Sequence, residues 1–229
     1  GKTRRIREQR LKFLVMGCIL GAMGLGAYLW DPGIPPPKVP VNVEALNLVR
    51  WSAQNRLELV EFEKPAGNSG GISWHRMGDG KFPDTLVVEG RGTLFIKPES
   101  PIFKVSGGFA DLGCREFGVL IDAAGGKLSL GLSLTRFSTT WILSSERMEI
   151  DKPRARGKQR EVRLMNRELP LPFSIAVIEN VVVFQVEGEV WDVLDLEARS
   201  DRISFYVADP YGTKAGFSGL ALEQGTLSE

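Results

Sequence analysis

Hydrophobic positions divide the chain into one continuous apolar segment near the N-terminus and a long region of short, alternating runs. The apolar segment is Phe13–Trp30, whose 18 residues include no charged side chain. As an α-helix it would extend about 27 Å, close to the ~30 Å hydrocarbon core of a bilayer. Because a helix satisfies its backbone polar groups internally, the pattern predicts a single transmembrane helix over residues 13–30.

The charges that flank this segment predict its orientation. The arm of residues 1–12 is rich in basic side chains, which are Lys2, Arg4, Arg5, Arg7, Arg10 and Lys12. Because such an excess stays on the cytoplasmic side, we expect an inner (cytoplasmic) membrane protein with its C-terminal domain in the periplasm or outside the cell. Arg10 and Lys12 would lie at the inner interface, and Tyr28 and Trp30 at the outer one. A cleaved signal peptide is the competing interpretation, and we expect a retained signal anchor.

Three glycines of the predicted span, Gly17, Gly21 and Gly24, fall on one helical face. Small residues at this spacing let a second membrane helix approach closely. Glycine lowers helix stability by up to ~1 kcal/mol relative to alanine, and tight packing would compensate for that loss. We therefore expect this face to pack on other membrane subunits; the alternative is that lipid simply tolerates the glycines.

Residues 31–41 form the predicted linker, because Asp31–Pro40 contains five prolines and is expected to be extended and semi-rigid. The region 42–229 that follows reads as short strands. Phe173, Ile175 and Val177 alternate with less apolar residues, a turn follows at Glu179-Asn180, and a second alternating run continues to a further turn at Gly188. About a dozen such runs predict an all-β, antiparallel sandwich or barrel.

Other elements follow from the same alternation and from Gly and Pro punctuation. We expect strands at Leu57–Phe62, Ile72–Arg76, Thr85–Glu89, Thr93–Lys97, Ile102–Ser106, Glu116–Ile121, Lys127–Thr135, Arg202–Val207 and Gly216–Leu222, and one strand or two over Thr139–Ile150. Ala124-Gly125-Gly126 predicts a hairpin turn. Asn42–Asn55 is ambiguous and compatible with a helical turn.

The closing part of the chain carries a strand at Ile175–Ile178, a tight turn, a strand at Val181–Val186, the turn Glu187-Gly188-Glu189, and the Gly-Phe strand Ala215–Leu222. Over about residues 172–222 this order resembles the laminin-G/concanavalin-A-like jelly roll. The resemblance implies a jelly-roll β-sandwich.

Some jelly rolls of this type are glycoside hydrolases with Glu-x-Asp-x-Glu on one strand. Here Val193-Leu194-Asp195-Leu196-Glu197 has valine in the first position, so one carboxylate is missing. We therefore expect no catalytic residues, and we interpret Asp192, Asp195 and Glu197 as solvated charges at a strand edge.

Charge and composition narrow the function further. Residues 1–38 carry seven basic and two acidic groups, which leaves 22 basic and 26 acidic groups, a net charge of −4, on the rest of the chain. That balance argues against nucleic-acid binding. His75 is the single histidine, and Cys18 and Cys114 are the two cysteines, so we expect neither a metal site nor a cofactor. We expect Cys114 to be buried and His75 to be structural or on the surface.

Two groups of side chains are candidates for binding. Trp51, Trp74, Trp141 and Trp191 are either core residues or platforms for glycan stacking. The stretch Asp151–Arg163 carries Lys152, Arg154, Arg156, Lys158, Arg160 and Arg163 on an otherwise acidic domain. We interpret it as either a solvated loop or hairpin tip, or a docking site for an acidic partner subunit or anionic lipid headgroups.

These patterns together favour a non-catalytic, single-span accessory subunit of a larger membrane complex, with a bacterial photosynthetic or respiratory complex as the first candidate host. Its helix would pack on other subunits, and its outer sandwich would stabilise the assembly. The alternative is a membrane-anchored glycan- or peptidoglycan-binding module. An anchored hydrolase that uses Asp195 or Glu197 is the weakest hypothesis.

Overall fold

The computed structural model describes residues 44–65, 72–78, 84–126, 128–149, 156–164, 168–208 and 214–227. The basic arm, the predicted span and the linker lie outside these ranges, so those predictions remain predictions. The predicted site residues that lie outside them are Arg10, Lys12, Gly17, Gly21, Gly24, Tyr28, Trp30, Lys152 and Arg154. Among the described residues, no helix has both the length and the hydrophobicity needed to cross a bilayer.

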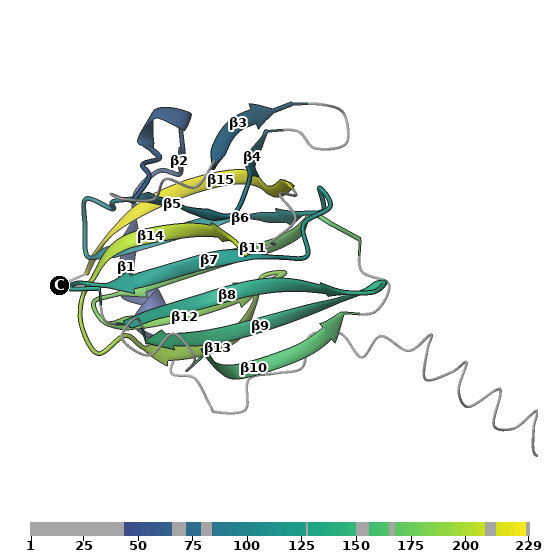
Figure 1. Cartoon of the computed structure of the whole chain (residues 1–229). Coiled ribbons are helices and arrows are strands. Elements are labelled where there is room, and N and C mark those ends of the chain that lie inside the picture. Colours follow the sequence, from purple (N-terminus) through teal and green to yellow (C-terminus); the bar gives the residue numbers. More distant parts are fainter. Residues whose placement is uncertain are drawn as a thin grey trace, which may run out of the picture. The chain divides into compact units, whose positions relative to one another are not determined.

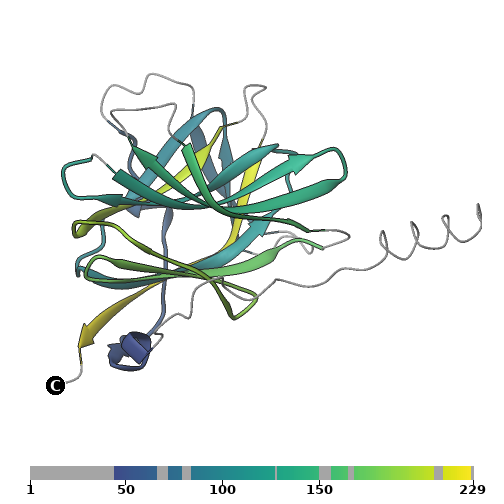
Figure 2. The same cartoon turned by 90° about the horizontal axis from the view of Figure 1, so that it is seen from below.

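Two antiparallel sheets form the body of the molecule, which confirms the predicted all-β sandwich (Figures 1 and 2). The six-stranded sheet has the order β10 (Arg156–Leu164), β9 (Thr140–Glu149), β8 (Leu128–Phe137), β7 (Glu116–Ala123), β14 (Ser200–Val207) and β5 (Gly92–Ile96). In Figure 1 these strands run from β5 at the top to β10 at the bottom.

The nine-stranded sheet lies behind the first in that view. Its order is β13 (Glu189–Asp195), β12 (Val181–Val186), β11 (Leu171–Ile178), β6 (Ile102–Ala110), β15 (Lys214–Leu227), β4 (Thr85–Glu89) and β3 (Ser73–Met77), and β1 (Val49–Trp51) and β2 (Asn55–Arg56) also pair with β15. Strand β15 is therefore the organising element of this sheet, because it pairs with four strands, β1, β2, β4 and β6, which all precede residue 111 in the chain.

The core lies between the sheets and is built by strict alternation. On β8, Leu128, Leu130, Leu132 and Leu134 are buried in it. The residues between them, including Ser129 and Ser133, therefore face the opposite side of the sheet. Aromatic rings fill the centre, and Phe109 stacks on Phe173 with ring centroids 4.5 Å apart.

The predicted turns are confirmed where the backbone must adopt positive φ. Glu179 between β11 and β12 has φ 58°, and Glu187-Gly188 between β12 and β13 has φ 53° and 83°. Gly125 and Gly126 connect β7 to β8. The ambiguous stretch near residue 45 contains a short helix, α2 (Glu44–Asn47), and the stretch after Thr139 forms one strand.

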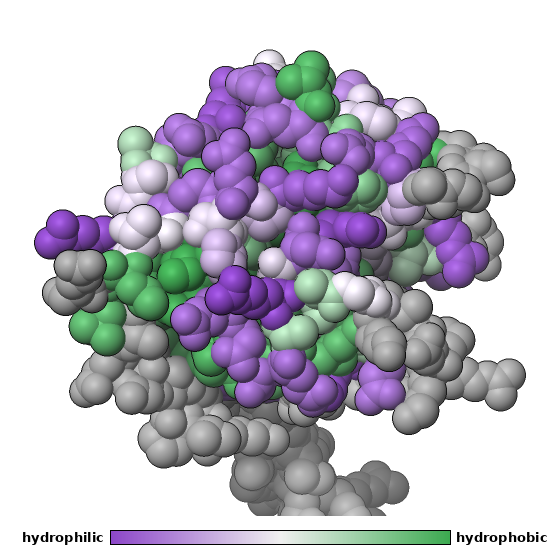
Figure 3. Space-filling model, turned by 90° about the vertical axis from the view of Figure 1, so that its left-hand side faces the viewer, coloured by the Kyte–Doolittle hydropathy of each residue, from purple (hydrophilic) through white to green (hydrophobic). Residues whose placement is uncertain are grey.

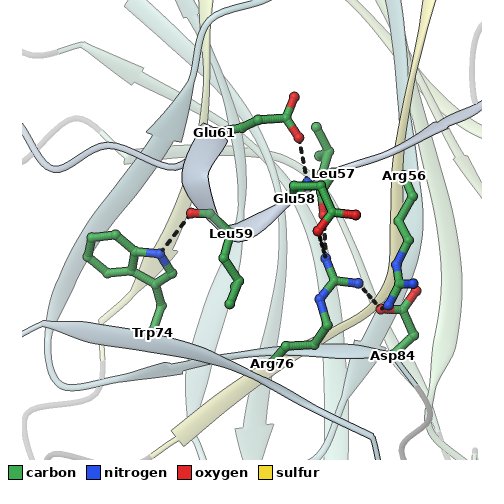
Figure 4. A network of polar contacts seen from close by, with 8 residues as sticks. All are labelled: Arg56, Leu57, Glu58, Leu59, Glu61, Trp74, Arg76 and Asp84. Atoms are coloured by element: carbon green, nitrogen blue, oxygen red, sulfur yellow. Dashed lines mark hydrogen bonds and ion pairs between the residues drawn. The ribbon is translucent and has the colours of Figure 1, made fainter.

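The prediction of a strand at Leu57–Phe62 is wrong, because Leu59–Glu61 form a 3₁₀-helix, η1. Its first turn has a capping box in which the Glu58 backbone N–H donates to the Glu61 carboxylate (Figure 4). Local hydrogen bonding of this kind competes with extended structure. Val60 on η1 is 90% exposed, so the alternation of this segment did not correspond to a buried sheet face.

Candidate functional site

The outward side of the six-stranded sheet carries a group of small and acidic side chains that we call the serine face. Its members are Asp122, Ser129, Ser133, Ser144, Glu146 and Ser204. Ser129 and Ser204 donate hydrogen bonds to the two carboxylate oxygens of Asp122, at 2.6 and 2.5 Å. Ser133 donates to Glu146 at 2.6 Å. The carboxylates of this face therefore accept hydrogen bonds from the neighbouring strands.

Larger side chains of the same sheet pack beside the serine face. A Cβ on Gly118 would lie 2.8 Å from the Tyr206 ring, and one on Gly131 would lie 2.5 Å from Leu120. The two glycines thus make room for the ring and the leucine. The four serines and Glu146 are buried, and Asp122 is half-buried.

Burial raises the pKa of Asp122 above its ordinary value, and the hydrogen bonds from Ser129 and Ser204 act in the opposite direction. The raised pKa shows that desolvation outweighs those two bonds. Because its serines and Glu146 are buried, the serine face serves as a polar layer of the structure and is not an open binding surface.

A second polar cluster lies between the sheets, where β9, β10 and β13 approach one another. The guanidinium of Arg160 lies 4.1 Å from the Trp191 ring centroid and donates to the Trp191 carbonyl. Ser145 donates to Asp192 at 2.5 Å. Burial lowers the pKa of Arg160, whereas the charge of Asp192 raises it. The cluster joins the two sheets through a cation–π contact and hydrogen bonds.

This cluster corrects the interpretation of the basic stretch. Arg156–Leu164 is the edge strand β10 and not a loop. Arg160 is buried, so its charge is not available for docking. Alternation along β10 points it inward, whereas Arg163 is exposed. Arg156 and Lys158 lie on the same strand. For the basic residues of this stretch other than Arg160, docking remains a prediction.

The acidic residues of β13 and the following turn are also engaged. Asp192 accepts from Ser145 and so is not a solvated charge. Asp195 accepts from the Asn180 side chain at 2.9 Å, and Glu197 pairs with Arg147. Asp195 and Glu197 are exposed, as predicted, but both stabilise local structure through these contacts.

A third polar group fixes η1 against β3 and β4 (Figure 4). Arg56 and Arg76 both pair with Asp84, and Arg76 also donates to the Leu57 carbonyl. Trp74 Nε1 donates to the Leu59 carbonyl at 3.3 Å. Since each arginine already pairs with a carboxylate, this group holds a connection in place and offers little to a ligand.

One pocket of about 440 Å³ lies at an end of the sandwich, and we call it the end pocket. It is lined by Gly113, Arg115, Arg136, Phe137 and Ser138. These residues come from the connection between β6 and β7, from the end of β8 and from the turn that follows it, which lie at the right-hand end in Figure 1. Two segments more than 20 residues apart in the chain therefore form one site.

Hydrogen bonds hold the two connections of the end pocket in place. The Arg136 N–H donates to the Arg115 carbonyl at 2.6 Å, which continues the β7–β8 ladder beyond its last pair. Gly113 has φ 99°, and its N–H donates to Asp111 at 3.0 Å. Ser138 has φ 58°, and its carbonyl accepts from Nε of Arg136 at 3.2 Å. Both connections are thus held by hydrogen bonds.

The side chains of the end pocket combine positive charge with an exposed ring. The Arg136 guanidinium lies 5.6 Å from the centroid of the buried Trp141 ring, and its Nη1 is 3.5 Å from Asp111 Oδ2. Phe137 is 71% exposed, a large value for an aromatic side chain. A ring next to guanidinium groups suits a ligand that has both an apolar face and polar substituents.

The structure places the tryptophan candidates away from this pocket, apart from Trp141 beneath it. Trp141 and Trp191 are core residues, whereas Trp51 and Trp74 are half-buried. Lysine ammonium groups already cover the half-buried pair, with Lys104 5.0 Å from the Trp51 centroid and Lys64 5.2 Å from the Trp74 centroid. None of the four is an open platform.

The histidine and cysteine predictions fit the described structure. His75 is exposed on β3, with Nδ1 3.9 Å from Glu89. Cys114 is buried, and its Sγ is 3.3 Å from the Glu116 carbonyl oxygen, to which it donates. Within the described ranges, no group of three or more His, Cys, Asp or Glu side chains is placed to hold a metal ion.

Sequence reasoning missed the end pocket, although one signal was present. The turn at Ala124-Gly125-Gly126 was predicted, and counting outward from it pairs Glu116 with Thr135. That register brings Arg115 beside Arg136. The serine face was also visible in the alternation from Leu128 to Leu134, where Ser, Gly and Ser occupy the positions between leucines.

No protein-family description matches the chain. No characterised protein matches it by sequence. Among solved structures, β-agarase B from Zobellia galactanivorans is similar over 83% of this chain and 99% of that one, at 11% identity and a TM-score of 0.48. A Bacillus licheniformis β-glucanase is similar over 77% of this chain and 97% of that one, at 7% identity and a TM-score of 0.43. The Caenorhabditis elegans galectin LEC-6 is similar over 74% of this chain and 99% of that one, at 7% identity and a TM-score of 0.39.

Proposed function

We propose that the sandwich is a non-catalytic glycan-binding module whose ligand occupies the end pocket. The observation that carries the proposal is the pairing of an exposed Phe137 ring with the guanidinium of Arg136 in a preformed pocket of about 440 Å³. Pockets of this size fall in the range that holds small ligands.

The chemistry of sugars fits this combination. A pyranose ring has an apolar C–H face that packs against an aromatic ring, and its hydroxyl groups accept from and donate to planar polar side chains. Phe137 would supply the apolar contact. Arg115 and Arg136 would donate, and the Ser138 hydroxyl would accept or donate. Because hydrogen bonds hold both connections, little conformational entropy would be lost on binding.

We propose binding and not hydrolysis because of what the acidic residues of the sandwich do. Asp195 and Glu197 are engaged with Asn180 and Arg147, and Asp122 accepts from two serines. Each of these carboxylates has a structural partner, and none of them lines the end pocket. The end pocket itself presents cations and a ring.

The test is glycan binding by the full chain, measured first on a glycan array and then by calorimetry with the best neutral or charged oligosaccharide. Phe137→Ala should weaken binding at least about tenfold, because it removes the stacking surface. Val60→Ala is the matched control, since Val60 is also largely exposed but lies on η1. Failure of every glycan to bind, or equal binding by both variants, would overturn the proposal.

A second candidate function is the accessory subunit, and one observation favours it. Leu48 and Leu227 are 57% and 49% exposed beside a small cluster of Val49, Ile102 and Ile178. Figure 3 looks at the side of the sandwich where β1 and the C-terminal end lie, and hydrophobic residues gather on it. An exposed apolar group of this kind is suited to contact with another protein.

We propose that this apolar corner, together with the glycine face of the predicted span, would attach the chain to membrane subunits if it belongs to a complex. Purification in mild detergent tests the idea. Leu48→Ser combined with Leu227→Ser should release co-purifying subunits, whereas Val60→Ser should not. A chain that migrates alone at its own mass would exclude this candidate.

A further inference from the structure

The geometry points to acidic glycans as the ligand class of the end pocket, with Arg136 as the specificity-determining residue. This inference rests on the proposed glycan-binding function and goes beyond it. The ligand that we infer carries an oxyanion on a sugar ring, as in the carboxylate of a uronic acid or in a sulfate ester. The ring would lie on Phe137 and the oxyanion against the guanidinium groups.

The end pocket carries a local positive charge. Two of the five residues that line the pocket are arginines, although residues 39–229 carry a net charge of −4. The positive charge is therefore local and not a property of the whole surface. The carboxylate of Asp111 lies 3.5 Å from Nη1 of Arg136, longer than the 2.7–2.9 Å typical of a charge-assisted hydrogen bond. This ion pair leaves the guanidinium able to take a second anion.

The protein engages some of the guanidinium N–H donors of Arg136 and fixes the plane of the group. Nε donates to the Ser138 carbonyl and Nη1 faces Asp111, so the plane of the guanidinium is fixed on one side. Within the described ranges, no protein acceptor bonds to Nη2 of Arg136. Packing against the Trp141 ring, at 5.6 Å, supports the same plane. A planar fork that is held in this way matches an oxyanion better than it matches a lone hydroxyl.

A charged and an aromatic side chain of the end pocket are neighbours in the chain. Arg136 and Phe137 are consecutive residues at the end of β8, and both line the pocket. Consecutive side chains of a strand point to opposite faces, so a ligand that contacts both must lie across the end of the strand, where the pocket is. A neutral sugar would keep the contact with Phe137 and lose the charge-assisted bonds.

The serine face gives an internal contrast. Its carboxylates would repel an anionic glycan, and its serines and Glu146 are buried. Of these two regions, the end pocket therefore has the chemistry that fits an acidic sugar.

The experiment uses the full chain and three tetrasaccharides with the same backbone: cellotetraose, its uronic-acid form and its 6-sulfate. Calorimetry should give an affinity at least about tenfold higher for one or both acidic forms than for cellotetraose, and this preference should fall as salt rises. The two acidic arms show whether a carboxylate or a sulfate is the better oxyanion.

Arg136→Gln should remove the preference and leave weak binding of all three sugars, whereas Arg136→Lys should restore only part of it. Arg50→Gln is the matched control, because Arg50 is exposed on β1 at the opposite end. If Arg136→Gln does not fold, as judged by near-UV circular dichroism, Arg115→Gln provides the same reading.

The outcomes separate the two proposals. Equal affinity for neutral and acidic tetrasaccharides, or an acidic preference that survives Arg136→Gln, would overturn this inference while leaving glycan binding intact. Binding of none of the three sugars, together with an empty glycan array, would overturn the proposed function and the inference with it.

Discussion

The serine face and the end pocket belong to the same six-stranded sheet, yet they treat polar groups in opposite ways. On the serine face, Asp122 accepts from serines on two neighbouring strands, and the serines are buried. In the end pocket, Arg136 is held by one carbonyl and a longer ion pair, and Phe137 is largely exposed. Polar residues whose partners lie within the sheet stabilise it, and those that point into a pocket can bind.

The contrast teaches that abundance of polar chemistry is a poor guide to a site. The serine face has more carboxylates and hydroxyls than the end pocket, but Asp122 already accepts from Ser129 and Ser204, and Glu146 already accepts from Ser133. Burial makes such groups costly to disturb, because an unsatisfied buried donor or acceptor destabilises the fold. The predictions below test whether the two regions separate into one that determines stability and one that determines binding.

The largest expected effect is on the serine face. Asp122→Ala would leave the hydroxyls of Ser129 and Ser204 without their acceptor, and we expect it to lower the free energy of unfolding by about 2–4 kcal/mol. Asp201→Ala, at an exposed neighbouring position of β14, should change it by less than about 0.5 kcal/mol. Urea denaturation measures both. A small effect of Asp122→Ala would show that the serine face contributes little to stability.

The next effect concerns the two glycines of that face. A Cβ on Gly118 would lie 2.5 Å from the Leu132 carbonyl oxygen, which is backbone, whereas the nearest atom to one on Gly131 is the end of the flexible Leu120 side chain. Gly118→Ala should therefore cost about 1–3 kcal/mol and Gly131→Ala distinctly less. Thermal unfolding of the pair checks the order. The reverse order would contradict the packing described for this face.

The pH dependence of stability provides a third test. Because burial raises the folded-state pKa of Asp122 above 3.8, the folded chain holds that proton more tightly than the unfolded chain. Its contribution to stability is complete below the unfolded pKa and is lost as pH rises through the raised folded pKa. Asp122→Asn cannot ionise, so its stability relative to wild type should increase as pH rises above about 4.

Denaturant unfolding at a series of pH values measures this difference. Parallel stability curves for the wild-type chain and Asp122→Asn would mean that desolvation of Asp122 does not affect folding. The end pocket offers the control, because Phe137→Ser should shift neither the shape nor the position of the curve.

The smallest expected effects on stability are in the end pocket. Phe137→Ser removes an exposed ring, and Arg136→Gln removes an ion pair whose partners are 40% and 35% exposed, so each should change the free energy of unfolding by less than about 1 kcal/mol. On glycan binding, Arg136→Gln should have the effect described above, and Phe137→Ser should weaken binding as Phe137→Ala does. A loss of stability comparable to that of Asp122→Ala would remove the distinction between the two regions.

Much of the fold was predictable from local pattern. The leucines at 128, 130, 132 and 134 required a strand with one buried face, and the turns at Glu179-Asn180 and Gly188 limited the hairpins on either side. Segment 57–62 was mispredicted because hydrophobic alternation gives no sign of the reciprocal hydrogen bonds between Glu58 and Glu61. A capping box gives a 3₁₀-helix where the hydrophobic period suggests a strand.

The candidate site was harder to predict, because its residues meet only through long-range pairing. Arg160 looked like a surface charge in a basic run, and its burial depends on Trp191, 31 residues away on the other sheet. Arg115 and Arg136 become neighbours through the β7–β8 register, which follows from the predicted turn at 124–126. The exposure of Phe137 could not be read from sequence, since a phenylalanine at the end of a strand is usually taken for core.

The most direct test of the central claim is an NMR titration of the isotope-labelled chain with the acidic tetrasaccharide. The account predicts saturable shifts of the Gly113 and Ser138 amides in the end pocket, with the Ser133 and Ser144 amides of the serine face unchanged. Saturable shifts on the serine face with none at Gly113 and Ser138 would contradict it.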